Sequence, residues 1–223
     1  MTTPYDFQVQ RDSSTLRQGV TESIRKAIAV GHYKAGDRMP EKQLCELTGV
    51  SRTLVREALR QLESERLVEV IAHKGPIVAQ MTAEEAKGVY EVREVLESLA
   101  ARLFARNATP RQFTDLEAAF AEVRTSYKVG DVLERLSAKN HFYDCLVKGS
   151  GNAALGQTLH MINARAMILR GRSLSHPERS KTSLKEIEAI ISALRDRDAD
   201  KAADMAVHHV QMAAQVALAS FEE

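Results

Sequence analysis

One stretch decides the fold of this chain: Gly49-Val50-Ser51-Arg52-Thr53-Leu54-Val55-Arg56-Glu57-Ala58-Leu59-Arg60-Gln61-Leu62. Its apolar residues recur every three to four positions, which predicts a helix with one buried face. Ser51 precedes this pattern and suits an N-cap, because its hydroxyl can accept a hydrogen bond from a free N–H of the first turn. Arg52, Thr53 and Arg56 lie off the apolar face, where they could contact base edges or phosphates in a major groove. By itself the stretch fits an ordinary solvated helix equally well.

The residues before this stretch predict two further helices. An apolar residue at every fourth position indicates an amphipathic helix over Leu16–Val30. A second helix is expected to open at Pro40-Glu41, to turn Leu44 and Leu47 inward and to close at Gly49. Two helices joined by a short glycine-containing turn, the second carrying polar residues at its start, form a helix-turn-helix.

Two β-rich runs follow, Leu67–Ile71 and Ile77–Gln80, separated by the loop Ala72–Pro76. Short strands around such a loop form a hairpin, and a basic tip can reach a groove or the adjacent DNA backbone. We interpret this hairpin as the wing of a winged helix. The loop alone would favour an exposed tip without a partner, and the neighbouring helix-turn-helix reverses that preference.

The remaining two thirds of the chain predict helices without strands. Helix starts are indicated at Thr82, Thr109-Pro110, Gly130-Asp131 and Asp198, because each residue type satisfies free N–H groups of a first turn. A fourth helix of this part is expected over about Ala153–Arg172, before a loop at 173–177, and a fifth is indicated by apolar residues from Leu184 to Leu194. The pattern of six helices is typical of an antiparallel helical bundle.

We therefore predict a mainly α protein of two domains. Residues 1–80 are expected to form a winged helix-turn-helix domain with a small β-hairpin, and residues 81–223 an all-α bundle. The 223 residues are 44% hydrophobic and 27% charged, which is ordinary for a globular protein. No apolar run reaches membrane-spanning length and no signal-peptide layout opens the chain, so we expect a cytoplasmic protein without a membrane partner.

Charge and cysteine content add two constraints. The net charge is +1, and the first 80 residues carry 12 basic against 10 acidic side chains, so DNA affinity would depend on where charges lie. Cys45 and Cys145 lie in helical patterns far apart in sequence. We expect both to be buried, reduced thiols rather than a disulfide.

The N-terminal part resembles the DNA-binding domain of the GntR transcription factors over roughly residues 15–80. The resemblance is carried above all by Val50-Ser51-Arg52-Thr53-x-Val55-Arg56-Glu57-Ala58-Leu59. It implies that Glu57 orients arginines or packs rather than contacting DNA. The residues expected to contact DNA are Arg38, Lys42, Ser51, Arg52, Thr53, Arg56, His73, Lys74 and Gly75.

The C-terminal part resembles the effector-binding FCD domain of the FadR subfamily over roughly residues 82–220. The match rests on Arg93-x-x-x-Glu97, Phe142, Ser150-Gly151-Asn152, the segment from Glu186 to Asp198, and His209. It implies a homodimer whose bundle holds a small organic acid, often through a divalent metal bound by one Asp and three His.

This chain departs from the family's metal ligands. Lys139 and Tyr143 stand where the family has Asp and His, Ile187 replaces a further His, and only His209 remains of the ligands that can be placed. An ammonium repels a divalent ion and one imidazole does not make a metal site, so we expect no metal and no other cofactor. The remaining histidines of the bundle are expected to be solvated or singly hydrogen-bonded: His141, His160 and His208.

The altered residues suit an anion directly. Effector-binding groups are predicted to converge between helices and to receive a carboxylate, with the lysine supplying part of the metal's charge: Arg93, Lys139, Tyr143, Arg165 and His209. The alternative is that Arg93 pairs with Glu97 as a structural contact while Lys139 extends to water.

These observations together predict a homodimeric transcription regulator that binds a double-stranded DNA operator, acts as a repressor and responds to a small organic acid. An enzyme is not expected, since no nucleophile elbow, zinc-protease helix or Cys-x-x-Cys pair occurs. Two alternatives remain: a DNA-binding protein whose bundle only dimerises, and an enzyme that uses a polar constellation in the bundle core.

Overall fold

The computed structural model describes the backbone of residues 11–174, 177–219 and 221. It describes their side chains except at 11–15, 160, 164, 166–168, 170–174 and 177–178. The chain divides into two compact units, Met1–Ile28 with His32–Ala79, and Ala29–Gly31 with Gln80–Glu223.

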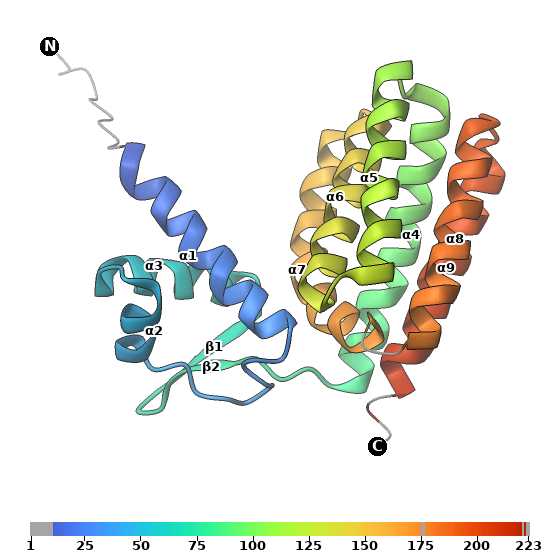
Figure 1. The fold of residues 1–223 in the computed structure, drawn as a ribbon. Coiled ribbons are helices and arrows are strands. Elements are labelled where there is room, and N and C mark those ends of the chain that lie inside the picture. Colours follow the sequence, from blue (N-terminus) through green and yellow to red (C-terminus); the bar gives the residue numbers. More distant parts are fainter. Residues whose placement is uncertain (1–10, 175–176, 220, 222–223) are drawn as a thin grey trace, which may run out of the picture. The chain divides into compact units, whose positions relative to one another are not determined.

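The first unit is the predicted winged helix-turn-helix (Figure 1). Its two strands pair antiparallel, with Val68 opposite Val78 and Ile71 opposite Gly75. A further backbone bridge joins Arg38 to Ile77. The elements are α1 (Arg11–Ala29), α2 (Glu41–Thr48), α3 (Arg52–Ser64), β1 (Val68–Ile71) and β2 (Gly75–Val78).

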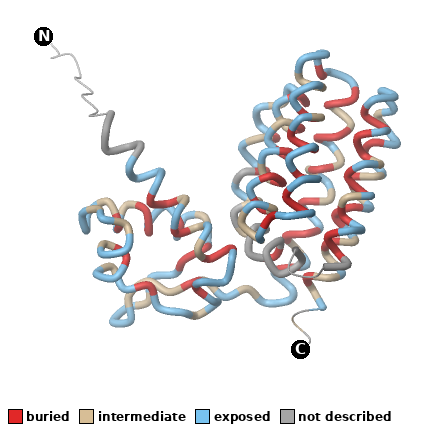
Figure 2. The backbone as a smooth tube through the Cα atoms, viewed as in Figure 1, coloured by how far each residue is buried: buried red, intermediate tan, exposed pale blue. Residues whose placement is uncertain are grey.

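The buried face of α3 holds this unit together. Val55, Ala58, Leu59 and Leu62 are all buried, at the spacing that the sequence pattern predicts. Burying one side chain of Val or Leu size contributes roughly 1.5–3 kcal/mol, so this single face is a large part of the unit's stability. Figure 2 shows that the opposite side of the same helix is exposed.

Two details of this unit differ from the prediction. Leu47 was expected to face inward and is 63% exposed, whereas Leu44 is 2% exposed. The second strand begins at Gly75 rather than Ile77 and ends at Val78. The reason is a tight turn: the N–H of Lys74 donates to the carbonyl of Ile71, so Gly75 already pairs with Ile71.

The second unit is an all-helical bundle (Figure 1). Helix α4 packs along α9, α8 packs on α9, and α5 packs on α6. None of the helices over the described residues is long and apolar enough to cross a membrane. The elements are α4 (Ala83–Asn107), α5 (Pro110–Val129), α6 (Val132–Ser150), α7 (Ala153–Leu174), α8 (Pro177–Arg195) and α9 (Ala199–Ala219).

Helices α4, α5 and α6 begin with a capping box. The side chains of Thr82, Thr109 and Asp131 each accept a hydrogen bond from the backbone N–H three residues later, and the side chain there bonds back to the cap. Two otherwise free donors are satisfied at each start, so the predicted boundaries are confirmed. Helices α7 and α8 extend into the predicted loop at 173–177, of which residues 175–176 lie outside the described residues.

The two cysteines are free thiols of intermediate exposure, so the expectation of buried thiols is wrong and that of unpaired thiols is confirmed. Burial, with the negative charges of Asp115 and Asp144, raises the pKa of Cys145. A raised pKa keeps the thiol protonated and therefore unreactive.

Candidate functional site

The start of α3 presents a polar surface. The hydroxyl of Ser51 caps the helix by accepting from the N–H of Leu54 at 3.4 Å. The side chains of Arg52, Thr53 and Arg56 are exposed in the first turns, on the side opposite the buried face. This is the arrangement in which a helix can enter a major groove with its N-terminal residues foremost.

A carboxylate holds Arg56 in place. Its Nε donates to both oxygens of Glu41, at 2.8 and 2.9 Å, which joins α3 to the start of α2. This hydrogen bond and the charge of Glu41 raise the pKa of Arg56. The acid that orients this arginine is therefore Glu41, and no ion pair of Glu57 is seen among the described residues.

The other predicted DNA contacts lie on α2 and the wing. Lys42 is exposed, with its Nζ 3.9 Å from a carboxylate oxygen of Glu46. Arg38 is exposed, and its backbone bridge to Ile77 ties it to the second wing strand. At the wing tip His73 and Lys74 are exposed, and Gly75 opens β2 at a φ of 80°.

Glu41 offers a test of how Arg56 is used. We expect Glu41→Gln to weaken binding to a specific operator about three- to tenfold, because Arg56 loses the carboxylate that positions it. The affinity for unrelated DNA should stay the same or rise, because the substitution removes a negative charge from the DNA-facing surface. Fluorescence anisotropy with both DNAs measures this ratio. Glu46→Gln is the matched control, since it removes the same charge from α2 without touching Arg56. Equal effects of the two substitutions would contradict a positioning role for Glu41.

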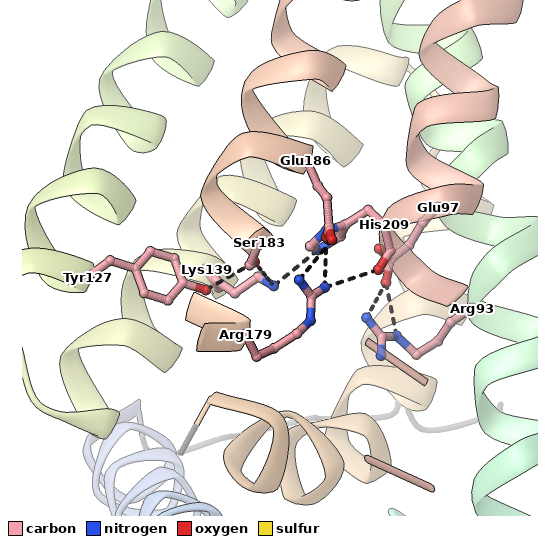
Figure 3. Close-up of polar contacts among 8 residues, drawn as sticks. All are labelled: Arg93, Glu97, Tyr127, Lys139, Arg179, Ser183, Glu186 and His209. Atoms are coloured by element: carbon pink, nitrogen blue, oxygen red, sulfur yellow. Dashed lines mark hydrogen bonds and ion pairs between the residues drawn. The ribbon is translucent and has the colours of Figure 1, made fainter. Parts of the chain in front are cut away.

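The bundle contains a buried polar cluster centred on His209 of α9, which is 1% exposed (Figure 3). Its Nδ1 lies 2.5 Å from Oε2 of Glu186, and its Nε2 lies 3.1 Å from Nζ of Lys139. A carboxylate only accepts, so Nδ1 carries the proton that bonds Glu186. The cluster thus connects α6, α8 and α9 through one imidazole.

Helix α8 contributes Arg179, Ser183 and Glu186 to the cluster. Arg179 donates through both terminal nitrogens to the two oxygens of Glu186, at 2.9 and 2.7 Å, and also to the backbone oxygen of His209 at 3.3 Å. Nζ of Lys139 donates to the hydroxyl of Ser183 at 3.4 Å, and this hydroxyl lies 3.3 Å from that of Tyr127. All of these side chains are buried.

Arg93 and Glu97 of α4 form a second buried ion pair. Nε and Nη2 of Arg93 donate to one oxygen of Glu97, at 2.9 and 2.7 Å. Burial would lower the pKa of Arg93, but the charge of Glu97 and its hydrogen bond, together with Tyr90 and Tyr143, more than compensate and raise it, so the guanidinium is always charged. Tyr143 interacts electrostatically with Arg93, and its ring lies 5.9 Å from Nζ of Lys139.

Of the five predicted effector residues, Lys139 lies against both His209 and Tyr143, and Arg93 interacts electrostatically with Tyr143. Arg165 instead lies 3.5 Å from Glu85 at the start of α4. Lys139 is 4% exposed, so the alternative in which it extends to water is wrong, while the Arg93–Glu97 pair of that alternative exists.

The other histidines are peripheral. His141 bonds to Glu122 on the surface and His208 is exposed, and the side chain of His160 lies outside those described. A groove of about 540 Å³ between α5 and α6 also carries Glu122, together with Glu134. Two carboxylates at its wall make this groove unsuited to an anion.

The residues present do not fit the metal that the family pattern implies. The Nε2 atom of His209 lies 3.1 Å from the ammonium of Lys139. The ammonium occupies the lone pair of Nε2 that a metal would need, and its charge would repel a cation. Ile187 is apolar and fully buried at the position of a second ligand. Within the described part of the chain no group of three His, Cys, Asp or Glu could hold a metal ion.

Sequence reasoning missed Arg179, Ser183 and Glu186 as site residues. The sequence does contain a pattern that links them: these three polar residues recur at i, i+4 and i+7 and so lie on one side of α8. They share this helix with buried Ile187, Ile190 and Ile191. The polar stripe of an amphipathic helix usually faces solvent. This stripe is buried because it has partners on α6 and α9, which the sequence of α8 alone does not show.

A winged helix-turn-helix with an exposed arginine-bearing recognition helix, followed by an all-helical unit, defines a DNA-binding transcriptional regulator. Residues 16–78 match the family model of bacterial regulatory proteins, gntR family, and residues 88–212 match the FCD domain. The chain therefore belongs to the GntR family, in the branch that carries an FCD domain. The matched families are regulators rather than enzymes, as the sequence predicts.

Two relatives and one solved structure show the extent of the similarity. The Nta operon transcriptional regulator of Aminobacter aminovorans is 31% identical over 185 residues, which are 81% of this chain and 84% of that protein. The galactonate operon transcriptional repressor of Escherichia coli (strain K12) is 26% identical over 210 residues, or 83% of this chain and 89% of that protein. The solved structure of E. coli McbR/YncC shares the fold, with a TM-score of 0.83 and 19% sequence identity. The match covers 96% of this chain and 100% of that chain.

Proposed function

We propose that this protein is a homodimeric repressor that binds a pseudo-palindromic operator and is controlled by a small organic acid in the bundle. The observation that carries the proposal is the buried cluster around Lys139 and His209, because a bundle that only dimerises has no need for cations in its core. Taking charged side chains out of water costs free energy, so a group of buried charged side chains gathered at one place in the bundle favours a ligand-binding role.

DNA recognition is assigned to the start of α3 and its surroundings. Arg52, Thr53 and Arg56 are exposed at the end of the helix that enters the groove, and they supply base or near-base contacts. Ser51, Arg38, Lys42 and the wing residues His73, Lys74 and Gly75 add backbone contacts, and the basic ones among them add salt dependence. The name of the galactonate operon repressor, a relative, supports repression over activation.

The effector part is tested by selecting an operator from random DNA and measuring its affinity in the presence of organic acids. We expect at least one acid to raise the melting temperature of the protein and to change operator affinity. An effector must favour one of two arrangements of the dimer, since equal affinity for both shifts nothing. A protein that binds its operator unchanged in the presence of every acid would be the dimerising alternative.

We place the dimer contact on α4, because Val92, Val95 and Leu99 form an exposed apolar stripe there, at 43%, 65% and 37% exposure. Their i, i+3, i+7 spacing puts them on one side of the helix, and the same stripe on a second copy can pair with it across a two-fold axis. Such a contact would fix the spacing of the two recognition helices.

Val95→Glu is expected to convert the dimer to a monomer at micromolar concentration, because it places a charge at the centre of an apolar contact. Analytical ultracentrifugation measures the mass. Val129→Glu is the control, since Val129 is 84% exposed and lies on α5, away from the stripe. A Val95→Glu protein that remains dimeric would show that the copies meet elsewhere.

A further inference from the structure

Some buried polar groups at the cluster have no hydrogen-bond partner within the described part of the chain. They include Nη1 of Arg93, Nε of Arg179 and the hydroxyl of Ser180. The three residues are 1%, 6% and 6% exposed, so bulk solvent does not satisfy these groups. A buried donor without a partner costs free energy that an acceptor at the same place would recover. Because native proteins satisfy nearly all such groups, these exceptions indicate a place where a ligand supplies the acceptors.

Contacts within the cluster connect the two arginines. Arg179 donates to the backbone oxygen of His209 at 3.3 Å, and the imidazole of His209 lies 3.1 Å from Nζ of Lys139. Lys139 in turn lies against the ring of Tyr143, which interacts electrostatically with Arg93. Figure 3 shows both guanidinium groups in this part of the bundle. The unpartnered groups of the two arginines therefore belong to one site.

The ion pairs of the two arginines use only part of each guanidinium. Arg93 donates to Glu97 through Nε and Nη2, which leaves Nη1. Arg179 donates to Glu186 through Nη1 and Nη2, which leaves Nε. Each pair therefore holds its guanidinium in place while one nitrogen stays available to a further acceptor. A carboxylate is the strong acceptor for such nitrogens.

The hydroxyl of Ser180 adds a group of a different kind. Ser180 follows Arg179 directly on α8, and its neighbours one and two turns further along the same side are Leu184 and Ile187. Both are apolar and offer the hydroxyl no acceptor. A hydroxyl can donate as well as accept, so it matches a hydroxyl or carbonyl oxygen of a ligand.

Resting on the proposed effector site, we propose that the effector is a hydroxy or oxo acid, whose carboxylate bonds the two arginines and whose further oxygen bonds Ser180. A carboxylate alone has two oxygens, whereas three unpartnered groups on two helices await acceptors. An unsubstituted acid of the same length would leave the hydroxyl of Ser180 unpaired. A site that bonds a ligand hydroxyl discriminates strongly against the analogue that lacks it.

The test uses the full-length protein and three series of short aliphatic acids of equal chain length. These are unsubstituted carboxylates, their hydroxy derivatives and their oxo derivatives, with the substituent on the first or the second carbon after the carboxylate. Calorimetric titration and melting temperature report binding. We expect at least one hydroxy or oxo acid to bind about tenfold more tightly than its unsubstituted parent. Binding by none of the probes would contradict the effector site itself, whereas unsubstituted acids that bind equally well or better at every length would overturn only the proposed class.

Substitutions separate the two kinds of contact. Ser180→Ala is expected to lower the affinity for the preferred acid about tenfold and to leave its unsubstituted parent within about twofold, while the ligand-free melting temperature holds or rises. Ser192→Ala removes an exposed hydroxyl from the same helix, is the matched control and should change neither affinity. An unchanged ratio of the two affinities in folded Ser180→Ala protein would overturn the proposal.

Arg93→Lys keeps a cation beside Glu97 but removes Nη1. We expect it to lower the affinity for the substituted and the unsubstituted acid by the same factor, about tenfold, because both carry the carboxylate. Folded Arg93→Lys protein that binds both acids as tightly as the unmodified protein would show that the carboxylate is held elsewhere and would overturn the assignment.

Discussion

Arg52→Ala is expected to weaken operator binding about 10- to 100-fold, as the loss of an arginine that bonds a guanine edge costs about 1–3 kcal/mol of binding free energy. The position supports this size of effect. Arg52 is the first residue of α3, its side chain is exposed, and the Ser51 cap fixes the helix end that carries it. Because Arg52 packs against nothing in the core, the free energy of unfolding should change by no more than about 0.5 kcal/mol.

Arg60→Ala provides the matched control, as Arg60 is exposed on the same helix two turns further from its start. Anisotropy titrations at several salt concentrations separate the two roles that an arginine can take. A base contact lowers affinity for the operator alone, whereas a phosphate contact lowers affinity for all DNA and reduces the salt slope by about one. Equal losses of operator affinity for Arg52→Ala and Arg60→Ala would contradict base recognition by the start of α3.

The sequence predicted the helix boundaries best where a local rule applies. Thr82, Thr109 and Asp131 cap helices as predicted, because a cap depends on residues within one turn. Leu47 was predicted wrongly, since the apolar pattern of a short helix does not show how far a core extends along it. The start of β2 depended on the tight turn at Lys74, which the order of residue types did not show.

The site was harder to predict for a physical reason. Lys139 and His209 were assigned from their positions in a family pattern, and they lie 3.1 Å apart although 70 residues separate them. No local rule pairs Arg179 and Glu186 with them, because that contact depends on how α8 packs between its neighbours. Glu41 was missed in the same way: its partner Arg56 lies 15 residues away, on the next helix.

Arg179→Met is expected to cost about 3–5 kcal/mol of stability, the usual effect of breaking a buried ion pair. Both partners are 5% exposed, and two hydrogen bonds of 2.9 and 2.7 Å join them. The loss is large because the guanidinium and the carboxylate are both held out of water, where each is stabilised by the charge of the other.

Urea unfolding followed by circular dichroism measures the loss, and hydrogen exchange of the amides of α8 and α9 locates it in the bundle. Arg195→Met is the control on the same helix: Arg195 pairs with Glu117 at the surface, with side chains 61% and 41% exposed, so about 0–1 kcal/mol is expected. The double substitution Arg179→Met with Glu186→Leu should recover part of the loss, since no carboxylate is then left buried beside an apolar side chain. If Arg179→Met lowers the free energy of unfolding by no more than Arg195→Met does, water reaches Glu186. The Arg179–Glu186 pair would then be screened like a surface pair and would contribute little to the stability of the bundle.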